Sequence, residues 1–458
     1  MRRKKISYIL LAVTSVVTVN TMQAQTRMTG KTPRLVVSVI IDNLTTSSLD
    51  RYSAMYGNDG FARLSAEGVI YNNVSCPFDG PDLISSAAAI MTGTTPYYNG
   101  ITGRQRLDRN TLRPTDSMGD TPEALQVSTI TDELKVATGG QAVVYAVAED
   151  KATAMITGGH AADAALWTDE RGGWNSVKYY NAGNTRWVTA YNRVTSTSAT
   201  ADRHDMLTDM AVQCVASGGM GTDDVSDMLT VTYDVEDTEE SYFSLDRNIG
   251  SLISRIEDAV GKERVLFIIT GTGHKEEEAA DYERYRIPTG MFYINRTVNL
   301  LNMFLSATYG QGRYAETSFG NQIFLNKKLI EQRKISLSEI LNRSKNFVME
   351  LSGVRNVTTS EEIMNNRCPD ERVRNAYNPA VCGDLIIETA PGWSIVDEDT
   401  GFTSQPRVSL VTFPLIFIGG GCQHRVTDAH VSIDAIAPTI ADIIHIRAPN
   451  ACRTAPVR

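Results

Sequence analysis

The 458-residue sequence lacks several features that would assign it to a common class of protein. Its six cysteines include no CxxC pair, which excludes zinc-ribbon and thioredoxin-like sites. Its 44 Lys and Arg residues are outnumbered by 53 Asp and Glu, and the resulting formal charge of −9 argues against a nucleic-acid-binding surface. Beyond the N-terminal segment, no run is long and apolar enough to cross a bilayer. We therefore expect no nucleic-acid partner and no transmembrane segment in the mature chain.

Residues 1–25 have the pattern of a secretory signal peptide. A basic stretch at residues 2–5 precedes an apolar run at residues 9–19, and Ala24 stands near a plausible cleavage point. The apolar run is too short for a membrane span. No cysteine lies near the cleavage point, so we do not expect a lipid anchor. We therefore expect a protein that is exported to the periplasm or beyond and is soluble after cleavage.

Export also bears on the cysteines. An oxidising compartment permits disulfides, and Cys368 with Cys382 would close a short loop. Buried free thiols are the alternative. The sequence does not decide between them.

Apolar, β-branched runs alternate with helical patterns along most of the chain. The runs expected to form buried strands are 34–42, 142–150, 264–270 and 408–421. The helical patterns are 49–68, which is interrupted near Gly57, 253–261 and 433–446. This alternation predicts an α/β fold with a doubly wound, mostly parallel central sheet and helices on both faces.

Residues 291–405 depart from that alternation. They contain a helix-like segment (297–310), a strand-like segment (319–326), two further helical patterns (326–335 and 337–353) and a polar loop around 366–384. We expect an inserted α+β subdomain here. The core then consists of residues 26–290 and 406–458.

Several blocks of the sequence together resemble the alkaline phosphatase superfamily. They are IIDNL (40–44), MTGTTPYYNGITG (91–103), STITDELKVAT (128–138), GGHAADAALWTDERGGWNSVKYY (158–180), IPTGMFYINRTVNLLNMFLSATYG (287–310), PGW (391–393) and IDAIAPTIADIIHI (433–446). The closest branch is the nucleotide pyrophosphatase/phosphodiesterase-like group of single-Thr-nucleophile phosphatases from bacterial periplasms. The resemblance implies an alkaline-phosphatase-like fold with a two-zinc site at the C-terminal ends of the central strands. One metal would activate a Thr or Ser nucleophile, and the other would stabilise the leaving oxygen.

The residues that this resemblance places at the nucleophile and the first metal position are only partly retained. Asp42 matches the first metal-binding aspartate, although an Asp that caps the next turn is an equal alternative. The nucleophile position falls on Leu83, whose side chain has no oxygen to attack phosphorus. Ser85 and Ser86 stand two and three residues away and are fallback nucleophiles. We favour the alternative that these serines cap the Ala-rich helix that follows.

The other metal-ligand positions hold different residues. An Asp-His pair is implied after the strand at 264–270, but Thr272 and Gly273 stand there. His274 is displaced by one residue, so we expect its side chain to point elsewhere. A histidine implied just before the last strand is matched by Thr412.

Changes extend to the groups that would hold the phosphoryl oxygens. The stretch that should supply a further Asp and His contains no histidine, and only Asp234 or Asp237 could coordinate there. By the same alignment Arg104 replaces an Asn, and a Lys and an Arg are replaced by Glu149 and Lys151. Arg104 and Lys151 are therefore the possible anion-binding residues.

The remaining histidines show no ligand spacing. The resemblance includes His160, which we expect to be a structural histidine in the loop on the substrate side. His204, His424, His430 and His445 are expected on the surface or satisfied in the core.

These changes favour a pseudophosphatase. Of the implied ligands only Asp42 remains, and zinc sites of this kind need about three or four protein ligands. We therefore expect no cofactor and an exported, catalytically inactive protein that has a binding or structural role in the periplasm or cell envelope. Its former cleft could bind a ligand through Arg104, Lys151 and the amides at the start of the helix at 85–91. A protein partner could instead dock on the inserted subdomain.

The alternative is an active, zinc-dependent phosphomonoesterase or phosphodiesterase with a rearranged site. Its candidate residues are Ser85 or Ser86 with Asp42, Asp82, His160 and His274. Hydrolysis of a sulfate or phosphonate ester would require the same metal ligands. Either activity needs several compensating shifts at once.

Overall fold

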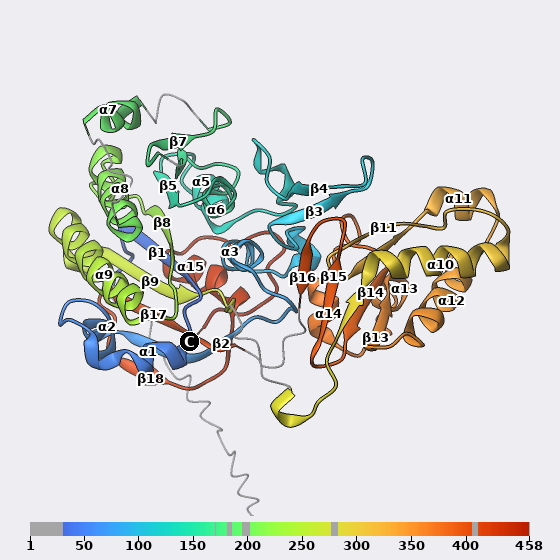
Figure 1. Ribbon diagram of the computed structural model, residues 1–458. Coiled ribbons are helices and arrows are strands. Elements are labelled where there is room, and N and C mark those ends of the chain that lie inside the picture. Colours follow the sequence, from blue (N-terminus) through green and yellow to red (C-terminus); the bar gives the residue numbers. More distant parts are fainter. Residues whose placement is uncertain are drawn as a thin grey trace, which may run out of the picture.

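The computed structural model describes residues 31–169, 171–180, 186–194, 202–275, 283–404 and 411–457 (Figure 1). The expected signal peptide (1–25) and the expected junction at 405–406 lie outside these ranges. Within the described ranges, no helix is long and apolar enough to span a bilayer.

A ten-stranded central sheet organises the fold. Its strands are β1 (Leu35–Asp42), β2 (Val69–Ser75), β5 (Val144–Ala148), β6 (Ala164–Thr168), β7 (Trp174–Ser176), β8 (Asp227–Asp234), β9 (Val265–Gly271), β17 (Phe413–Gly419), β18 (Arg425–Thr427) and β19 (Val431–Ser432). They lie in the order β18-β2-β17-β9-β1-β8-β5-β6-β7, and β19 pairs with β2. The central pairs from β9 to β6 are parallel, whereas β17 and β7 are antiparallel to their neighbours. The predicted mostly parallel α/β sheet is confirmed.

Helices cover both faces of this sheet, as predicted (Figure 1). One face carries α3 (Leu83–Thr92), α5 (Ile130–Ala137), α6 (Lys151–Gly158) and α15 (Ile436–Ile443), and the other carries α2 (Phe61–Glu67), α8 (Arg203–Gly218) and α9 (Glu239–Val260). Side chains of β1 alternate between the two cores: Val36 packs in one and Val37 in the other. Because both faces are covered, all eight residues of β1 are buried.

Short elements complete the core. They are α1 (Thr46–Arg51), α4 (Pro96–Asn99), α7 (Arg186–Val194), the hairpin of β3 (Gln105–Asp108) and β4 (Arg113–Asp116), and 3-10 turns at Ser53–Met55, Pro122–Ala124, Lys262–Arg264, Glu283–Tyr285 and Ile433–Ala435. The helical pattern expected at 49–68 is thus divided among α1, a 3-10 turn and α2, with Gly57 in the gap.

The chain between β9 and β17 builds separate sheets. Its elements are β10 (Gly290–Tyr293), α10 (Ile294–Tyr309), β11 (Ala315–Phe319), β12 (Gln322–Leu325), α11 (Lys327–Gln332), α12 (Leu337–Met349), β13 (Val354–Thr359), α13 (Ser360–Met364), α14 (Glu371–Ala376), β14 (Leu385–Thr389), β15 (Trp393–Asp397) and β16 (Phe402–Ser404). They form the sheets β11-β12-β14-β13 and β10-β15-β16, which lie beside the central sheet (Figure 1). We call this part of the chain the inserted subdomain; it has a hydrophobic core of its own.

The segment expected as a polar loop around 366–384 is packed and partly helical. It contains α14, and Cys368, Tyr377 and Cys382 form a small buried cluster with Ile363. Both of these cysteines are free in the structure, as are the other four. Of the two alternatives left open by the sequence, the structure has buried thiols at these positions.

Candidate functional site

A cleft of about 560 Å³ lies where β1, β8, β5 and β6 end. In an open α/β sheet, ligands bind at the carboxyl ends of the strands, and this volume is within the range of small-molecule sites. Six carboxylates line the cleft: Asp42, Asp82, Glu149, Asp150, Asp169 and Asp234. Two guanidinium groups, from Arg104 and Arg203, and the ring of His274 also line it.

Asp42, the retained candidate ligand, has both carboxylate oxygens engaged. The hydroxyl of Thr272 donates to Oδ1 at 2.5 Å, and Nδ1 of His274 lies 3.0 Å from Oδ2. Our expectation that His274 would point elsewhere is wrong. Gly273, which precedes it, has a φ of +69°, and this left-handed turn brings the histidine back over the end of β1.

Asp234 lies beside Asp42 because the two residues are register partners on β8 and β1. Its carboxylate accepts a hydrogen bond from Nδ2 of Asn43 at 2.9 Å. Partial burial and the neighbouring charge of Asp42 raise the pKa of the Asp234 carboxyl. Asp237, the other candidate ligand, instead pairs with Arg51 at 3.0 Å and does not line the cleft.

The N-terminus of α3 is capped by Asp82. Oδ1 of Asp82 accepts hydrogen bonds from the backbone N–H of Ser85 at 2.8 Å and from its hydroxyl at 2.6 Å, and Oδ2 accepts from the backbone N–H of Arg104 at 2.8 Å. The cap is therefore the aspartate, and Ser85 completes a capping box from within the helix. Ser86 is fully buried beneath the helix. Of the nucleophile candidates, only Leu83 lines the cleft.

The candidate anion-binding residues do not share a site. Arg104 lines the cleft and its guanidinium pairs with Asp150 at 3.2 Å, whereas Lys151 pairs with Asp120 and does not line the cleft. A second guanidinium, that of Arg203, pairs with Glu149 at 3.1 Å. Partial burial raises the pKa of the Glu149 carboxyl even though Arg203 acts to lower it. No sequence motif pointed to Arg203, because the stretch before α8 contains no recognisable one.

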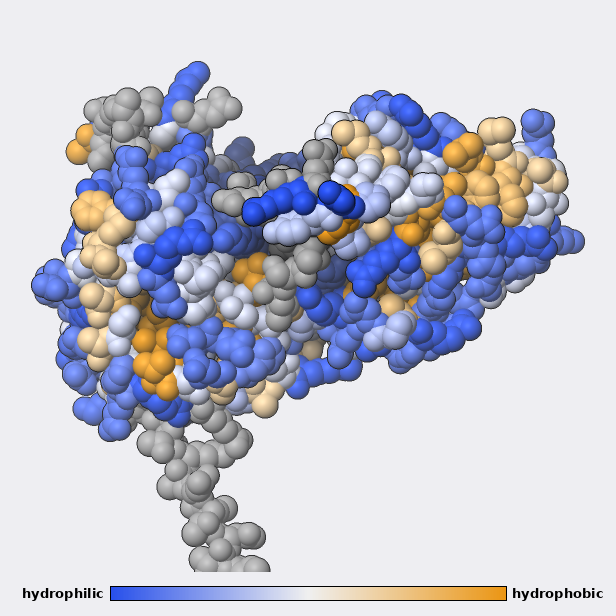
Figure 2. Space-filling view, turned by 60° about the horizontal axis from the view of Figure 1, so that its bottom comes forward, coloured by the Kyte–Doolittle hydropathy of each residue, from blue (hydrophilic) through white to orange (hydrophobic). Residues whose placement is uncertain are grey.

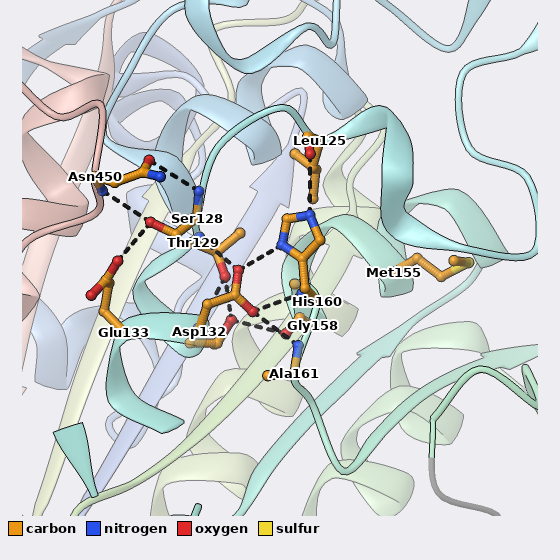
Figure 3. A network of polar contacts seen from close by, with 12 residues as sticks. Leu125, Ser128, Thr129, Asp132, Glu133, Met155, Gly158, His160, Ala161 and Asn450 are labelled. Carbon is orange, nitrogen blue, oxygen red and sulfur yellow. Dashed lines mark hydrogen bonds and ion pairs between the residues drawn. The ribbon is translucent and has the colours of Figure 1, made fainter. Parts of the chain in front are cut away.

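His160 does not belong to this site, and its expected place on the substrate side is wrong. The helix α6 begins at the cleft, where Asp150 caps it, and His160 lies beyond its other end. The ring of His160 contacts Asp132 through Nδ1 at 2.8 Å and the carbonyl oxygen of Leu125 through Nε2 at 3.1 Å (Figure 3). These contacts join the end of α6 to the start of α5. We call the residues involved the His160 network; they are Leu125, Thr129, Asp132 and His160.

Three of the other histidines have hydrogen-bond partners within the fold. Nε2 of His204 donates to the carbonyl oxygen of Asp234 at 2.7 Å. His424 contacts the carbonyl oxygen of Gly68, His430 contacts the hydroxyl of Ser75, and His445 has a φ of +59°.

The residues present do not fit a zinc pair. Within the described part of the chain, no group of three or more His, Cys, Asp or Glu side chains could hold a metal ion. Near Asp42 the donor side chains are Asp234 and His274, and the ring of His274 already contacts Asp42. Gly273 offers no side chain, and the backbone at Thr412 accepts from the N–H of Thr46 at the start of α1.

The fold and the position of the cleft define an open α/β protein with a ligand-sized cleft at the carboxyl ends of its central strands. The chain belongs to the type I phosphodiesterase/nucleotide pyrophosphatase family, whose sequence profile matches residues 36–408. This confirms the alkaline phosphatase superfamily inferred from the sequence blocks.

Two curated relatives match over almost their full lengths. Alkaline phosphatase PafA of Elizabethkingia meningoseptica is 22% identical, covering 93% of this chain and 94% of the relative. Alkaline phosphatase PhoV of Synechococcus elongatus is 24% identical, covering 91% of each. The crystal structure of PafA superposes with a TM-score of 0.80 over 93% of this chain and 98% of that one, at 21% identity. Murine ectonucleotide pyrophosphatase/phosphodiesterase 5 superposes with a TM-score of 0.56 over 90% and 95%, at 11% identity. These structures confirm the fold.

Proposed function

We propose that this protein is an exported, catalytically inactive member of its family that binds a ligand or a partner in the periplasm or cell envelope. The observation that carries the proposal is the state of Asp42. Its two oxygens are engaged by Thr272 and His274, both within the chain. A metal at Asp42 would have to displace these contacts without gaining a set of ligands to replace them.

The nucleophile position supports the same conclusion. Leu83 is the first residue of α3 and lines the cleft, so an apolar side chain stands where the family places an attacking hydroxyl. Ser85 donates its hydroxyl to Asp82, and Ser86 is buried, so neither presents an oxygen to the cleft. Without a nucleophile or a metal to activate water, ester hydrolysis has no starting group.

The inserted subdomain offers a surface for a protein partner. Figure 2 shows apolar side chains gathered on this part of the molecule, at the right of the view. Leu300 and Met303 on α10, and Leu337 and Met349 on α12, are all exposed. Exposed apolar side chains of this kind are common at sites of protein association.

The proposal is tested by metal analysis of the purified mature protein together with phosphomonoesterase and phosphodiesterase assays in added zinc. We expect well under one equivalent of zinc per chain and no turnover above buffer. Asp42→Ala is compared with Asp258→Asn, a change to an exposed residue of α9 outside the cleft. Stoichiometric zinc, with turnover that Asp42→Ala abolishes and Asp258→Asn preserves, would establish the active alternative.

A further inference from the structure

One side of α10 is exposed along the whole length of the helix. Arg296, Leu300, Met303, Ala307 and Gly310 are all exposed, and they follow one another at intervals of four, three, four and three residues. Such alternating intervals place side chains in one stripe along a helix and are typical of the seam between two packed helices. Leu300 is 46% exposed and Met303 is 70% exposed. The stripe, which we call the α10 stripe, therefore has the spacing of a helix–helix contact.

The α10 stripe carries almost no charge. Residues 297–312 contain no Asp, Glu, Lys or Arg. Arg296, at the start of the stripe, donates from Nε to Glu398 at 2.8 Å, so its charge is balanced within the chain. The solvent-facing side of a surface helix usually carries charged side chains. An exposed side without them is suited to contact with another apolar surface.

The charge of the inserted subdomain differs from that of the rest of the chain. Residues 291–405 contain 12 Lys and Arg against 13 Asp and Glu, whereas residues 26–290 and 406–458 contain 28 against 40. Two copies that approached through their acidic cores would repel each other. Figure 1 shows the inserted subdomain extending to one side of the central sheet, with α10 as one of its helices. Two copies can therefore meet through this subdomain without the repulsion between their cores.

The α10 stripe is complementary to a second copy of itself. When two α10 helices pack antiparallel about a two-fold axis beside Met303, Leu300 of each copy lies opposite Ala307 of the other. A large side chain then faces a small one, as close packing of helices requires. Because the contact is two-fold, each such pair occurs twice. The same axis places Arg296 opposite Gln311, so no like charges meet.

The helix is already fixed in position in the single chain. Leu305, on its inner side, is fully buried in the core of the inserted subdomain. Phe304 stacks on Phe347 of α12 with ring centroids 4.7 Å apart, and the hydroxyl of Tyr309 donates to Glu339 of the same helix at 3.0 Å. A preformed surface loses little conformational entropy when it binds.

We propose that two copies of this chain associate through antiparallel packing of their α10 helices, along Leu300, Met303 and Ala307. One stripe on each copy is a small contact, and small contacts are typical of transient association. The inference rests on the proposed function, because it names the protein partner of the inserted subdomain as a second copy of the chain.

Sedimentation velocity of the full mature protein, from about 1 to 100 μM, measures the association. We expect a shift from monomer to dimer as the concentration rises. Met303→Glu places two carboxylates close together at the axis and should weaken association by about tenfold or more. Val136→Glu is the matched control, because Val136 on α5 is 72% exposed, lies outside the inserted subdomain and gains the same charge. This control should associate as the parent does.

A pair of opposite charges tests whether Met303 meets its own copy. Met303→Lys should also weaken association when it is studied alone. An equimolar mixture of Met303→Glu and Met303→Lys should associate more tightly than either variant, because opposite charges then meet at the axis. Met303 is exposed in the single chain, so both variants should keep the thermal unfolding midpoint of the parent.

Three results would overturn the proposal. The first is a parent protein that stays monomeric at every concentration, and the second is a dimer that Met303→Glu does not weaken. The third is a mixture that associates no better than its components, which would show that α10 contacts a different surface. Flotation with phosphatidylcholine vesicles should leave the parent unbound. Flotation of a monomeric parent that Met303→Glu abolishes would instead assign the stripe to a lipid surface.

The two proposals fail separately. Zinc-dependent turnover would contradict the inactive assignment whether the chain is a monomer or a dimer. An inactive protein that stays monomeric would contradict only the contact between α10 helices.

Discussion

Asp132 of α5 lies near the C-terminal end of α6 and is only 7% exposed. Its carboxylate accepts hydrogen bonds from the backbone N–H groups of Thr129, His160 and Ala161, and it also contacts the ring of His160 (Figure 3). At the N-terminal end of the same helix, the cleft holds six carboxylates, and Thr232 has a buried hydroxyl without a partner in the described chain. One helix thus separates a region where buried polar groups satisfy one another from a cleft where carboxylates are crowded together and one buried hydroxyl has no partner in the described chain.

The difference between the two ends of α6 indicates which of them stabilises the fold and which is suited to binding. Groups that satisfy one another inside the protein stabilise the fold, because breaking one contact leaves another group buried and unpaired. Carboxylates held close together and an unpaired hydroxyl cost stability, and such groups are typical of binding sites. Substitutions at the cleft end of α6 should therefore cost less stability than those at the other end, and removal of the unpaired hydroxyl should raise the free energy of unfolding.

The largest effect is expected for Asp132→Ala. It leaves the backbone N–H groups of Thr129, His160 and Ala161 without their acceptor, and we expect a loss of about 3–5 kcal/mol in the free energy of unfolding measured in urea. Asp169→Ala is the matched change at the cleft. Asp169 also accepts backbone hydrogen bonds but is exposed, so water replaces them and we expect a loss below about 1 kcal/mol. Equal losses at the two sites would contradict the contrast between the two ends of α6.

The His160 network should also give a pH dependence. The hydrogen bond between the ring of His160 and the carboxylate of Asp132 raises the pKa of His160. Burial opposes ionisation of Asp132, but hydrogen bonds from His160 and Thr129 leave the pKa of its carboxyl below the usual value. The histidine contribution is fully present below about pH 6.5 and is lost as the pH rises through its raised pKa. The aspartate contribution is present above about pH 3.9 and is lost as the pH falls through its lowered pKa.

His160→Gln should therefore cost most between about pH 4 and 6.5, by about 1 kcal/mol, and progressively less above that range. Urea unfolding at a series of pH values, compared with the parent protein, measures the difference. A cost that grows with rising pH would show that the neutral ring makes the important contact.

A smaller effect of opposite sign is expected at the cleft. Thr232→Val removes a buried hydroxyl that has no partner in the described chain and should raise the free energy of unfolding by about 0.5–1 kcal/mol in the absence of ligand. Thr131→Val is the matched control in α5, because Thr131 is equally buried but donates its hydroxyl to the carbonyl oxygen of Gly158 at 2.8 Å. That control should lose about 1 kcal/mol. Destabilisation by both changes would show that Thr232 has a partner in solution, such as a bound water.

The sequence was sufficient to predict the central sheet where apolar runs are continuous. β1, β5, β9 and β17 were all expected, because strands covered on both faces are uniformly apolar. β8 was missed. Its Thr230 and Thr232 are buried hydroxyl-bearing residues that interrupt the apolar pattern, so the stretch lacks the continuous apolar run that marked the other strands.

The site was less predictable because side-chain direction depends on backbone geometry. A displacement of one residue suggested that His274 would turn away, but the left-handed conformation of Gly273 reverses that direction. The place of His160 could not be deduced either. A loop that follows a strand lies at the strand's carboxyl end, whereas a loop that follows the next helix lies at the opposite end of the sheet. His160 follows α6, so it lies at the end opposite the cleft. The prediction that the nucleophile position falls on Leu83 rests on alignment alone, and no conformation of leucine supplies an oxygen.

The smallest effect is expected from placing a hydroxyl at the position of Leu83. Leu83→Thr places a hydroxyl at the start of α3 and in the cleft. We expect no measurable turnover of phosphate esters with added zinc, because a hydroxyl is a weak nucleophile until a base or metal activates it. Asp42 remains bound to Thr272 and His274 in this variant, and nothing in the substitution frees it. Zinc-dependent turnover by Leu83→Thr would mean that the metal ligands are still functional and that one leucine separates this chain from catalysis. The cleft end of α6 would then be a silenced active site, and its crowded carboxylates would be metal ligands.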